Sequence, residues 1–200
     1  MPRVQRLTQR PLKTGLHESL RVRFYFVTVT GVHATRPNML TILIRPYKAS
    51  DVSSLVSLFR ASVRSIAARD YDPSQIQAWA PDTIDEEKFG RRRESKETWV
   101  AEVEDRIGGF SDLAPDGHVD SLYVHPDFQR RGVARALLRY VEQQARAIDV
   151  LRLCTEASIT ARPAFEAVGF RVIVPQTINM RGEAMTVYRM EKQLDAGPTP

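Results

Sequence analysis

The sequence predicts an α+β domain in which helices flank a mixed β-sheet. Its 200 residues, 42% hydrophobic and 26% charged, fit one ordinary globular domain with or without an appendage. Runs with strand character and runs with helical periodicity alternate in the order β-α-α-β-β-β-α-β-α-β-β. Three consecutive strands stand in the middle of that order with good turn chemistry between them, which favours a mixed sheet over a wholly parallel one.

The first 39 residues differ from the rest in charge. They hold seven basic residues and one acidic residue, whereas residues 40–200 hold 22 basic and 23 acidic residues. A nucleic-acid-binding protein should carry its positive charge on the folded face that meets the polymer, so a nucleic-acid partner is not expected. The run 24–30 has the composition of a short edge strand, and the Arg-rich composition is also typical of organellar transit peptides, without a clear cleavage site. We favour a poorly ordered extension over 1–39, a domain over 40–192 and a frayed tail over 193–200.

The domain opens with a short strand and two helices. Leu40–Ile44 is a β-rich run, and Ser50 or Asp51 can cap the helix that follows. The apolar positions of that helix have three-and-four spacing: Val52, Leu55, Val56, Phe59, Val63 and Ile66. A second helix is expected from Asp72-Pro73 to Trp79, where Pro81 stops it.

The remaining elements follow the same patterns. Strands are predicted over 98–103, 107–113 and 118–124, with turn chemistry in 114–117. A long amphipathic helix is predicted over 131–148 and a strand over 150–155. A helix over 160–168 and strands over 170–178 and 184–190 complete the domain. The Arg91–Arg93 run is interpreted as a solvated helix end.

Several classes of site are excluded by what the sequence contains. The single cysteine, Cys154, cannot form an intramolecular disulfide or a cysteine cluster, and its best role is that of a small buried hydrophobe. The four histidines have no metal-ligand spacing, so we expect no metal. No stretch approaches the roughly 20 apolar residues that span a bilayer. With nothing clearly secretory, the expected compartment is the cytoplasm and no membrane partner is expected.

The clearest chemical signal lies where the third of the three central strands ends. Pro126 breaks the strand, and a short basic loop with Gly132 then feeds the N-terminus of the long helix. Free backbone N–H groups and the positive end of the helix dipole make such a place an anion site, and glycine allows close approach of a ligand. Further donors come from the side chains of Gln129, Arg130, Arg131 and Arg135. The alternative is a solvated basic helix start.

The run Gln129-Arg130-Arg131-Gly132-Val133-Ala134 resembles the pyrophosphate loop of the GNAT family of acyl-CoA-dependent N-acyltransferases, Gln/Arg-x-x-Gly-x-Gly/Ala. Other anchors appear in the family's order across 40–192: Ile44-Arg45-Pro46 through Asp51, Leu122-Tyr123-Val124, and Gly169-Phe170. The resemblance implies the GNAT fold, a central splayed sheet flanked by helices. It also implies direct acetyl transfer from acetyl-CoA to a primary amine of an unidentified acceptor.

The resemblance also implies roles for individual residues. The backbone of Leu122, Tyr123 and Val124 would pair with the pantetheine arm, and the amides from Arg130 to Arg135 would hold the pyrophosphate. Ser158, Ala161 and Phe165 stand at the three named positions of the family's Asn-x-x-Ala-x-x-x-Tyr pattern, beside the thiol end of the cofactor. Serine replaces the asparagine there, and Phe165 replaces the tyrosine that usually acts as general acid.

Proton transfer therefore needs other candidates. On the predicted strand 118–124, His118 and Asp120 are two residues apart and should share one face. Imidazole titrates near neutrality, and Asp120 is placed slightly ahead because it is deeper in the strand. The structural alternatives are an exposed turn residue for His118 and an arginine partner for Asp120. Tyr188 is a candidate replacement acid, with a packed strand tyrosine as its alternative.

Two rival functions remain open. The first is a sensor or regulatory domain that binds acyl-CoA without turnover, which the replacements at Ser158 and Phe165 motivate. The second is nucleic-acid binding through the basic N-terminus. The expected partners are acetyl-CoA and an amine acceptor, and a homodimer is compatible with the sequence. Tyr71, Trp79 and Phe89 lie in the segment that usually forms the acceptor wall in the family, although core packing explains each of them singly.

Overall fold

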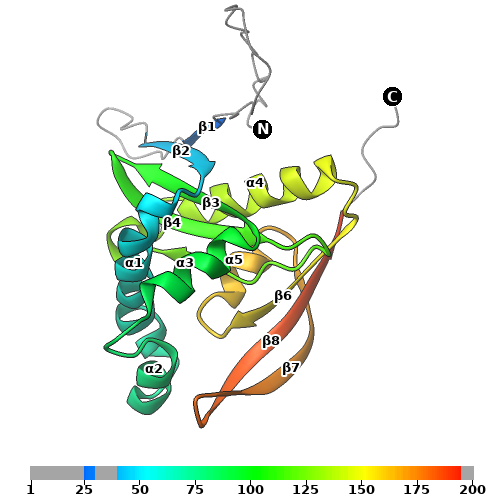
Figure 1. Ribbon diagram of the computed structural model, residues 1–200. Coiled ribbons are helices and arrows are strands. Elements are labelled where there is room, and N and C mark those ends of the chain that lie inside the picture. Colours follow the sequence, from blue (N-terminus) through cyan, green and yellow to red (C-terminus); the bar gives the residue numbers. More distant parts are fainter. Residues whose placement is uncertain (1–24, 30–39, 195–200) are drawn as a thin grey trace, which may run out of the picture.

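A computed structural model describes residues 25–29 and 40–194 (Figure 1). The strands are β1 (Tyr25–Val29), β2 (Leu40–Pro46), β3 (Glu97–Val103), β4 (Arg106–Leu113), β5 (Leu122–Val124), β6 (Arg152–Ser158), β7 (Arg171–Met180) and β8 (Glu183–Gln193). The α-helices are α1 (Val52–Ser65), α2 (Pro73–Trp79), α3 (Glu86–Glu94), α4 (Val133–Ala147) and α5 (Arg162–Glu166). Short 3-10 turns are η1 (Ala49–Asp51), η2 (Ala67–Arg69) and η3 (Pro126–Phe128). Within these ranges, no helix is long and apolar enough to cross a membrane.

The strands form two antiparallel sheets that meet at one point. The first sheet has the order β1-β2-β3-β4-β5 and the second the order β6-β8-β7. A parallel bridge between His118 and Cys154 connects them, with the Val119 N–H donating to the Cys154 carbonyl at 2.9 Å. Beyond this bridge β5 and β6 do not pair. The predicted mixed sheet is therefore confirmed, and it opens into a gap between β5 and β6.

Helices cover the first sheet on both faces (Figure 1). Side chains alternate across a strand, and Phe110 packs with Leu55 and Leu58 of α1. The neighbouring Gly109 faces α4, where a Cβ atom would lie only 3.0 Å from the Val133 side chain. Glycine at this position therefore lets α4 lie close against β4. α1 and α4 pack on opposite faces of the sheet that carries β5.

A separate hydrophobic cluster ties α1 and α2 to the second sheet. Its buried members are Val63, Ala67, Tyr71, Ile76, Ala80 and Met185, the last of them on β8. Burial of apolar surface stabilises this contact by roughly 25 cal/mol per Å² removed from water. The helices on the α1 face are thus held against both sheets.

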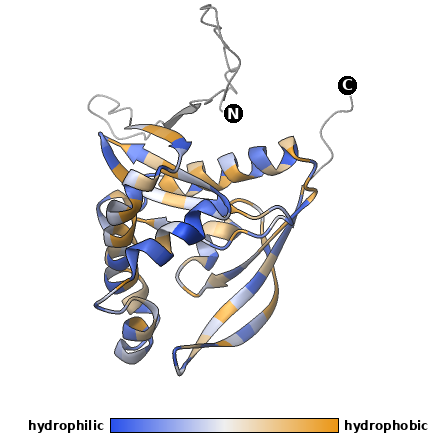
Figure 2. Ribbon diagram, in the orientation of Figure 1, coloured by the Kyte–Doolittle hydropathy of each residue, from blue (hydrophilic) through white to orange (hydrophobic). Residues whose placement is uncertain are grey.

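The periodic helices are confirmed, and their ends follow local chemistry. The Asp72 side chain accepts the Gln75 N–H at 3.1 Å, and the Gln75 side chain accepts the Asp72 N–H at 3.0 Å, which is a capping box. α3 has no counterpart in the predicted order, because its sequence is almost entirely charged and has no repeating apolar pattern. Figure 2 shows it as hydrophilic over most of its length. Its N-terminus is capped by Asp85, which accepts the Lys88 N–H.

Four expectations differ from the structure. The strand predicted over 118–124 is limited to β5, and the strand predicted over 150–155 lies at 152–158. Arg93 is not a solvated helix end: it is 4% exposed and pairs with buried Asp112. Asp51 is the N-cap residue of α1, but its side chain does not bond to the helix, because the carboxylate binds Arg45 and the Lys48 N–H.

Part of the predicted N-terminal extension pairs with the domain. Tyr25 lies opposite Ile44 and Val29 opposite Leu40, so β1 is an antiparallel edge strand on β2. The rest of 1–39 lies outside the described residues. At the other end, Leu194 is 5% exposed, and the described chain stops there, inside the predicted tail.

Candidate active site

The loop between β5 and α4 exposes unpaired backbone donors. The chain passes through η3 and then through two residues in the left-handed region, Arg130 at φ 57° and Gly132 at φ 87°. Gly132 is the N-cap of α4, and among the described residues no side chain caps the helix. The N–H groups of Val133, Ala134 and Arg135 donate to no acceptor within the described chain. Together with the helix dipole, they form a site for an anion.

The basic side chains around this loop have different orientations. Arg131 pairs with Glu104 at 3.1 Å and lies over the ring of buried Phe128, so it is directed toward the β3–β4 turn. Arg130 and Arg135 are exposed and make no ion pair with other described residues. They are therefore the side chains free to add charge at the N-terminus of α4. The Gln129 N–H donates to Pro126 within the turn, at 3.3 Å.

One edge of β5 pairs with no other described strand. The His125 N–H donates to Gly108 on β4 at 2.9 Å, and Tyr123 lies opposite Phe110. Because hydrogen-bonding direction alternates along a strand, the N–H and C=O groups of Leu122 and Val124 point away from β4 and into the gap. An extended ligand can pair with such an edge in the way that an added strand does.

A buried polar network sets where β5 begins. The side chain of Asp112 is fully buried; its Oδ1 accepts the N–H groups of Asp120 and Ser121 at 2.9 and 3.0 Å. Its Oδ2 accepts from Arg93 at 3.1 Å, and Arg93 also donates to the Ser121 hydroxyl. The backbone of residues 120–121 therefore bonds to a side chain instead of continuing a ladder with β6. This arrangement leaves the gap open directly before Leu122.

His118 is paired with a carboxylate that the sequence analysis did not single out. Its Nε2 lies 2.6 Å from Glu156 Oε2 on β6. In the tautomer that donates Nε2–H to Glu156, the lone pair of Nδ1 is available to accept a proton. The signal in the sequence is weak, because the partnership exists only once β6 lies beside the chain at 118.

Asp120 is held by cations. Its carboxylate lies 2.7 Å from Lys96 and 2.8 Å from Arg92. Burial raises the pKa of Asp120, but the Lys96 hydrogen bond and the charge of Arg92 outweigh burial and hold the pKa below its usual range. A carboxylate with a lowered pKa is a weak proton acceptor. The arginine-partner interpretation of Asp120 therefore fits the structure well.

The residues predicted at the thiol end are accounted for by local packing. Ser158 Oγ accepts the Ala161 N–H at 3.0 Å, within the turn between β6 and α5. Phe165 is 2% exposed and packs edge-on against Phe170. Tyr188 is partly exposed and lies opposite Ala157, and Arg162 stands 4.7 Å from its ring centroid.

Candidate base and candidate acid lie on opposite faces of the second sheet. Ala157 and Tyr188 pack toward the core under α4, whereas the preceding Glu156 and its partner His118 occupy the other face. The loop between β5 and α4, which we call the anion loop, leads into α4 and therefore lies on the same side of the second sheet as Tyr188. His118 and Glu156 therefore lie on one face of the second sheet, and Tyr188 lies on the other.

A wide hollow of about 690 Å³ neighbours this region without containing the anion loop. It lies between α1 and the start of β4, and His125 forms part of its wall. None of the candidate site residues from the sequence lines it.

Comparison with known proteins yields a family model, a curated relative and solved structures. The family model described as "Acetyltransferase (GNAT) domain" matches residues 67–194. The "Uncharacterized N-acetyltransferase YafP" of Escherichia coli K12 is 35% identical over 152 residues, which cover 76% of this chain and 96% of that protein.

Among solved structures, a GCN5-related N-acetyltransferase from Rhodopseudomonas palustris has a TM-score of 0.73 and 32% identity, covering 85% of this chain and 99% of that one. The yncA protein of Salmonella typhimurium, solved with its cofactor acetyl-CoA, has a TM-score of 0.61 and 20% identity. That match covers 80% of this chain and 97% of that one, and at this identity it shows the fold alone.

Proposed function

This chain belongs to the GNAT family of acetyltransferases, and we propose that it transfers the acetyl group of acetyl-CoA directly to a primary amine. The observation that carries the proposal is the adjacency of two unsatisfied backbone features. The uncapped N-terminus of α4 follows the free edge of β5 within nine residues of chain, so one elongated ligand can use both. The cytoplasm is the proposed compartment.

Each part of acetyl-CoA has a matching set of groups in this proposal. The pyrophosphate would accept hydrogen bonds from the N–H groups of residues 133–135, with Arg130 and Arg135 adding charge. The pantetheine arm would pair with Leu122 and Val124 along the gap. The acetyl-CoA bound by the Salmonella protein supports this assignment, because the two chains share the fold.

The chemistry needs a neutral amine beside the thioester. The amine nitrogen attacks the carbonyl carbon, and His118 Nδ1 takes the proton that the nitrogen loses; Glu156 stabilises the resulting imidazolium. Negative charge that develops on the carbonyl oxygen is met by N–H groups on the free edge of β5. The C–S bond then breaks, and the departing thiolate takes a proton from Tyr188 or from water on the other face of the sheet.

The test of donor binding is a glycine substitution with a matched control. Gly132 and Gly182 share a positive φ, 87° and 96°, but Gly182 stands in the β7–β8 turn, where an added Cβ atom would have no neighbour within 4 Å. Both Gly132→Val and Gly182→Val should lose stability from backbone strain. Only Gly132→Val should lose affinity for acetyl-CoA, by about tenfold or more, since it alters the N-cap that faces the pyrophosphate.

Isothermal calorimetry on both folded variants measures the difference. Gly132→Asn provides a second variant, because asparagine tolerates the left-handed region. Wild-type affinity in both folded Gly132 variants would contradict the placement of acetyl-CoA on this loop.

A sensor that binds acyl-CoA without turnover is the second candidate. It is favoured by Phe165, which is buried and has no hydroxyl to offer a leaving thiolate. Release of free thiol in the presence of an amine separates the two functions, because a sensor would bind acetyl-CoA and leave it intact.

A further inference from the structure

Three aromatic side chains span the gap on the face opposite α4. Tyr71 Oη accepts the N–H of Ile159, directly after β6, at 2.9 Å and donates to the Thr186 carbonyl on β8. Trp79 Nε1 donates to Tyr123 Oη on β5 at 3.3 Å. The rings of Tyr71 and Trp79 meet edge-on with centroids 5.6 Å apart. We call Tyr71, Trp79 and Tyr123 the aromatic bridge.

The aromatic bridge lies where β5 and β6 would pair if the two sheets were continuous. Continuing the register of the His118–Cys154 bridge would bring residue 123 opposite residue 159. The side chain of Tyr123 and the backbone of Ile159 are instead bound by side chains of the η2–α2 segment, Trp79 and Tyr71. Burial raises the pKa of Tyr123 to about 12, so the phenol stays neutral. On this face, the aromatic bridge therefore covers the wide end of the gap, which is the end farther from the His118–Cys154 bridge.

The η2–α2 segment, which carries Tyr71 and Trp79, is hydrogen-bonded to the β7–β8 hairpin. Gln75 donates to the Ala184 carbonyl on β8 at 2.7 Å, and Asp70 accepts from Thr160, in the turn between β6 and α5, at 2.6 Å. The side chain of Arg181, in the turn between β7 and β8, donates to the Ala78 carbonyl on α2. With Met185 in the hydrophobic cluster below, these contacts hold α2 in place. The aromatic bridge is thus held in position by the contacts around it.

The narrow end of the gap is polar and open to solvent. His118 and Glu156 are 26% and 42% exposed at their side chains, and Arg92 beside Asp120 is 61% exposed. These residues lie on the face away from α4, so an acceptor can reach the gap here while the donor occupies the α4 side.

Building on the proposed function, we infer that the acceptor is a small molecule with a primary amine, which enters at the His118–Glu156 end, and that the aromatic bridge excludes peptide chains. A lysine within a peptide brings flanking residues on both sides, and these need a trough that is open at both ends. Here one end is closed by Tyr71, Trp79 and Tyr123. A small amine needs only the polar end.

The test compares acceptors of the same chemistry and different size. The full-length protein with acetyl-CoA is offered a panel of small amines: aliphatic diamines, aromatic amines and single amino-acid amides, including lysine amide. Peptides of about 15 residues carry the same lysine and N-terminal amines. Thiol release and mass spectrometry measure transfer, and we expect kcat/KM for at least one small amine to exceed that of every peptide by tenfold or more.

The outcomes separate this inference from the proposed function. A peptide used as well as, or better than, every small amine would overturn the inference and leave the transferase assignment intact. Absence of acetyl-CoA binding, or bound acetyl-CoA without thiol release for any acceptor, would overturn the proposed function and the inference with it.

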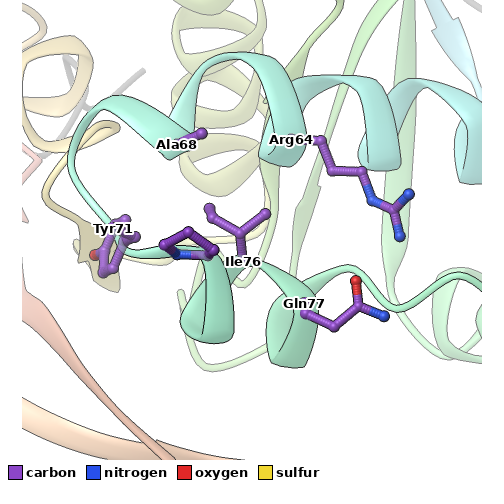
Figure 3. A pocket seen from close by; sticks show the side chains of 6 residues that line it. Arg64, Ala68, Tyr71, Ile76 and Gln77 are labelled. Atoms are coloured by element: carbon purple, nitrogen blue, oxygen red, sulfur yellow. The ribbon is translucent and has the colours of Figure 1, made fainter.

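A substitution in the aromatic bridge tests its role directly. Trp79→Ala removes the central ring and should raise kcat/KM for peptides relative to small amines by about tenfold, whereas Trp79→Phe keeps a ring and should change this ratio less. The control is Gln77→Ala on the same helix. Gln77 is directed away from Tyr71 at the far end of a hollow of about 310 Å³ between α1 and α2 (Figure 3).

Melting temperatures identify folded variants, and Trp79→Leu, which keeps apolar volume, replaces the alanine variant if that does not fold. An unchanged peptide-to-amine ratio in a folded variant without the ring would overturn the role of the aromatic bridge.

Discussion

At the scale of single residues, the surroundings of His118 and Asp120 differ more than their spacing indicates. Both stand in a run that reads as one strand, and the depth of Asp120 in that run favours it as the base. The structure gives Asp120 two cationic partners and a lowered pKa, and it gives His118 one carboxylate. Electrostatics therefore favours His118 as the proton acceptor.

Substitution of each residue should show this difference. His118→Asn is expected to lower kcat/KM by roughly a hundredfold, the usual scale of general base catalysis. Asp120→Asn should stay within about tenfold of wild type and keep the same pH profile, because a group whose pKa is already low remains charged throughout the neutral range and contributes no titration there. Steady-state rates from pH 6 to 9, with an acceptor from the panel, measure both. A hundredfold loss in Asp120→Asn with an active His118→Asn would reverse the assignment.

At the scale of elements, α3 determines the geometry of β5. Two adjacent arginines of this helix bind the same corner from two sides: Arg92 contacts Asp120 at the surface, and Arg93 contacts Asp112 and Ser121 in the interior. The Arg93 guanidinium also lies 5.0 Å from the Phe89 ring and 5.5 Å from the Phe110 ring. A charged helix therefore fixes a strand edge that the site needs.

The buried and exposed pairs should differ sharply in stability. Asp112→Ala leaves the Arg93 charge buried without its partner and should cost about 3 kcal/mol in the free energy of unfolding. Arg92→Ala removes a solvent-exposed ion pair and should cost less than about 1 kcal/mol. Urea denaturation measures both values. Asp112→Ala should also weaken acetyl-CoA binding, and equal costs for the two variants would refute the buried network as the support of β5.

Most elements could be predicted because they carry a repeating apolar pattern. α1 and α4 follow helical periodicity, and the strands around 98–113 and 171–193 follow β-rich runs closed by turns. α3 could not be predicted in this way, since the burial of its arginine is decided by Asp112, 19 residues away along the chain. A run of three arginines looks solvated until that partner is in place.

The anion loop belongs to a second kind of prediction, because its chemistry is local. Gly132 and the uncapped helix start are neighbours in sequence, so the motif and the exposed N–H groups coincide. The pair of His118 with Glu156 and the aromatic bridge each join residues from distant segments, and no local pattern marks them. The roles assigned to Tyr188, Ser158 and Phe165 at the thiol end stay predictions.

At the scale of the whole molecule, the candidate site is one gap with two differently built sides. In the proposed function, α4 and its N-terminal loop would bind the donor, and the α1 face, with its polar opening and the aromatic bridge, would receive the acceptor. Direct transfer requires both substrates to be bound at the same time, and separate approaches to the gap would allow this.

The structure of the protein with bound acetyl-CoA tests this central claim most directly. We predict pyrophosphate oxygens at about 3 Å from the N–H groups of residues 133–135, and the pantetheine arm paired with Leu122 and Val124. The acetyl group should end in the gap, on the side of the aromatic bridge that faces His118. Acetyl-CoA bound instead in the hollow beside His125 and α1, with the N-terminus of α4 and the edge of β5 left free, would contradict the account.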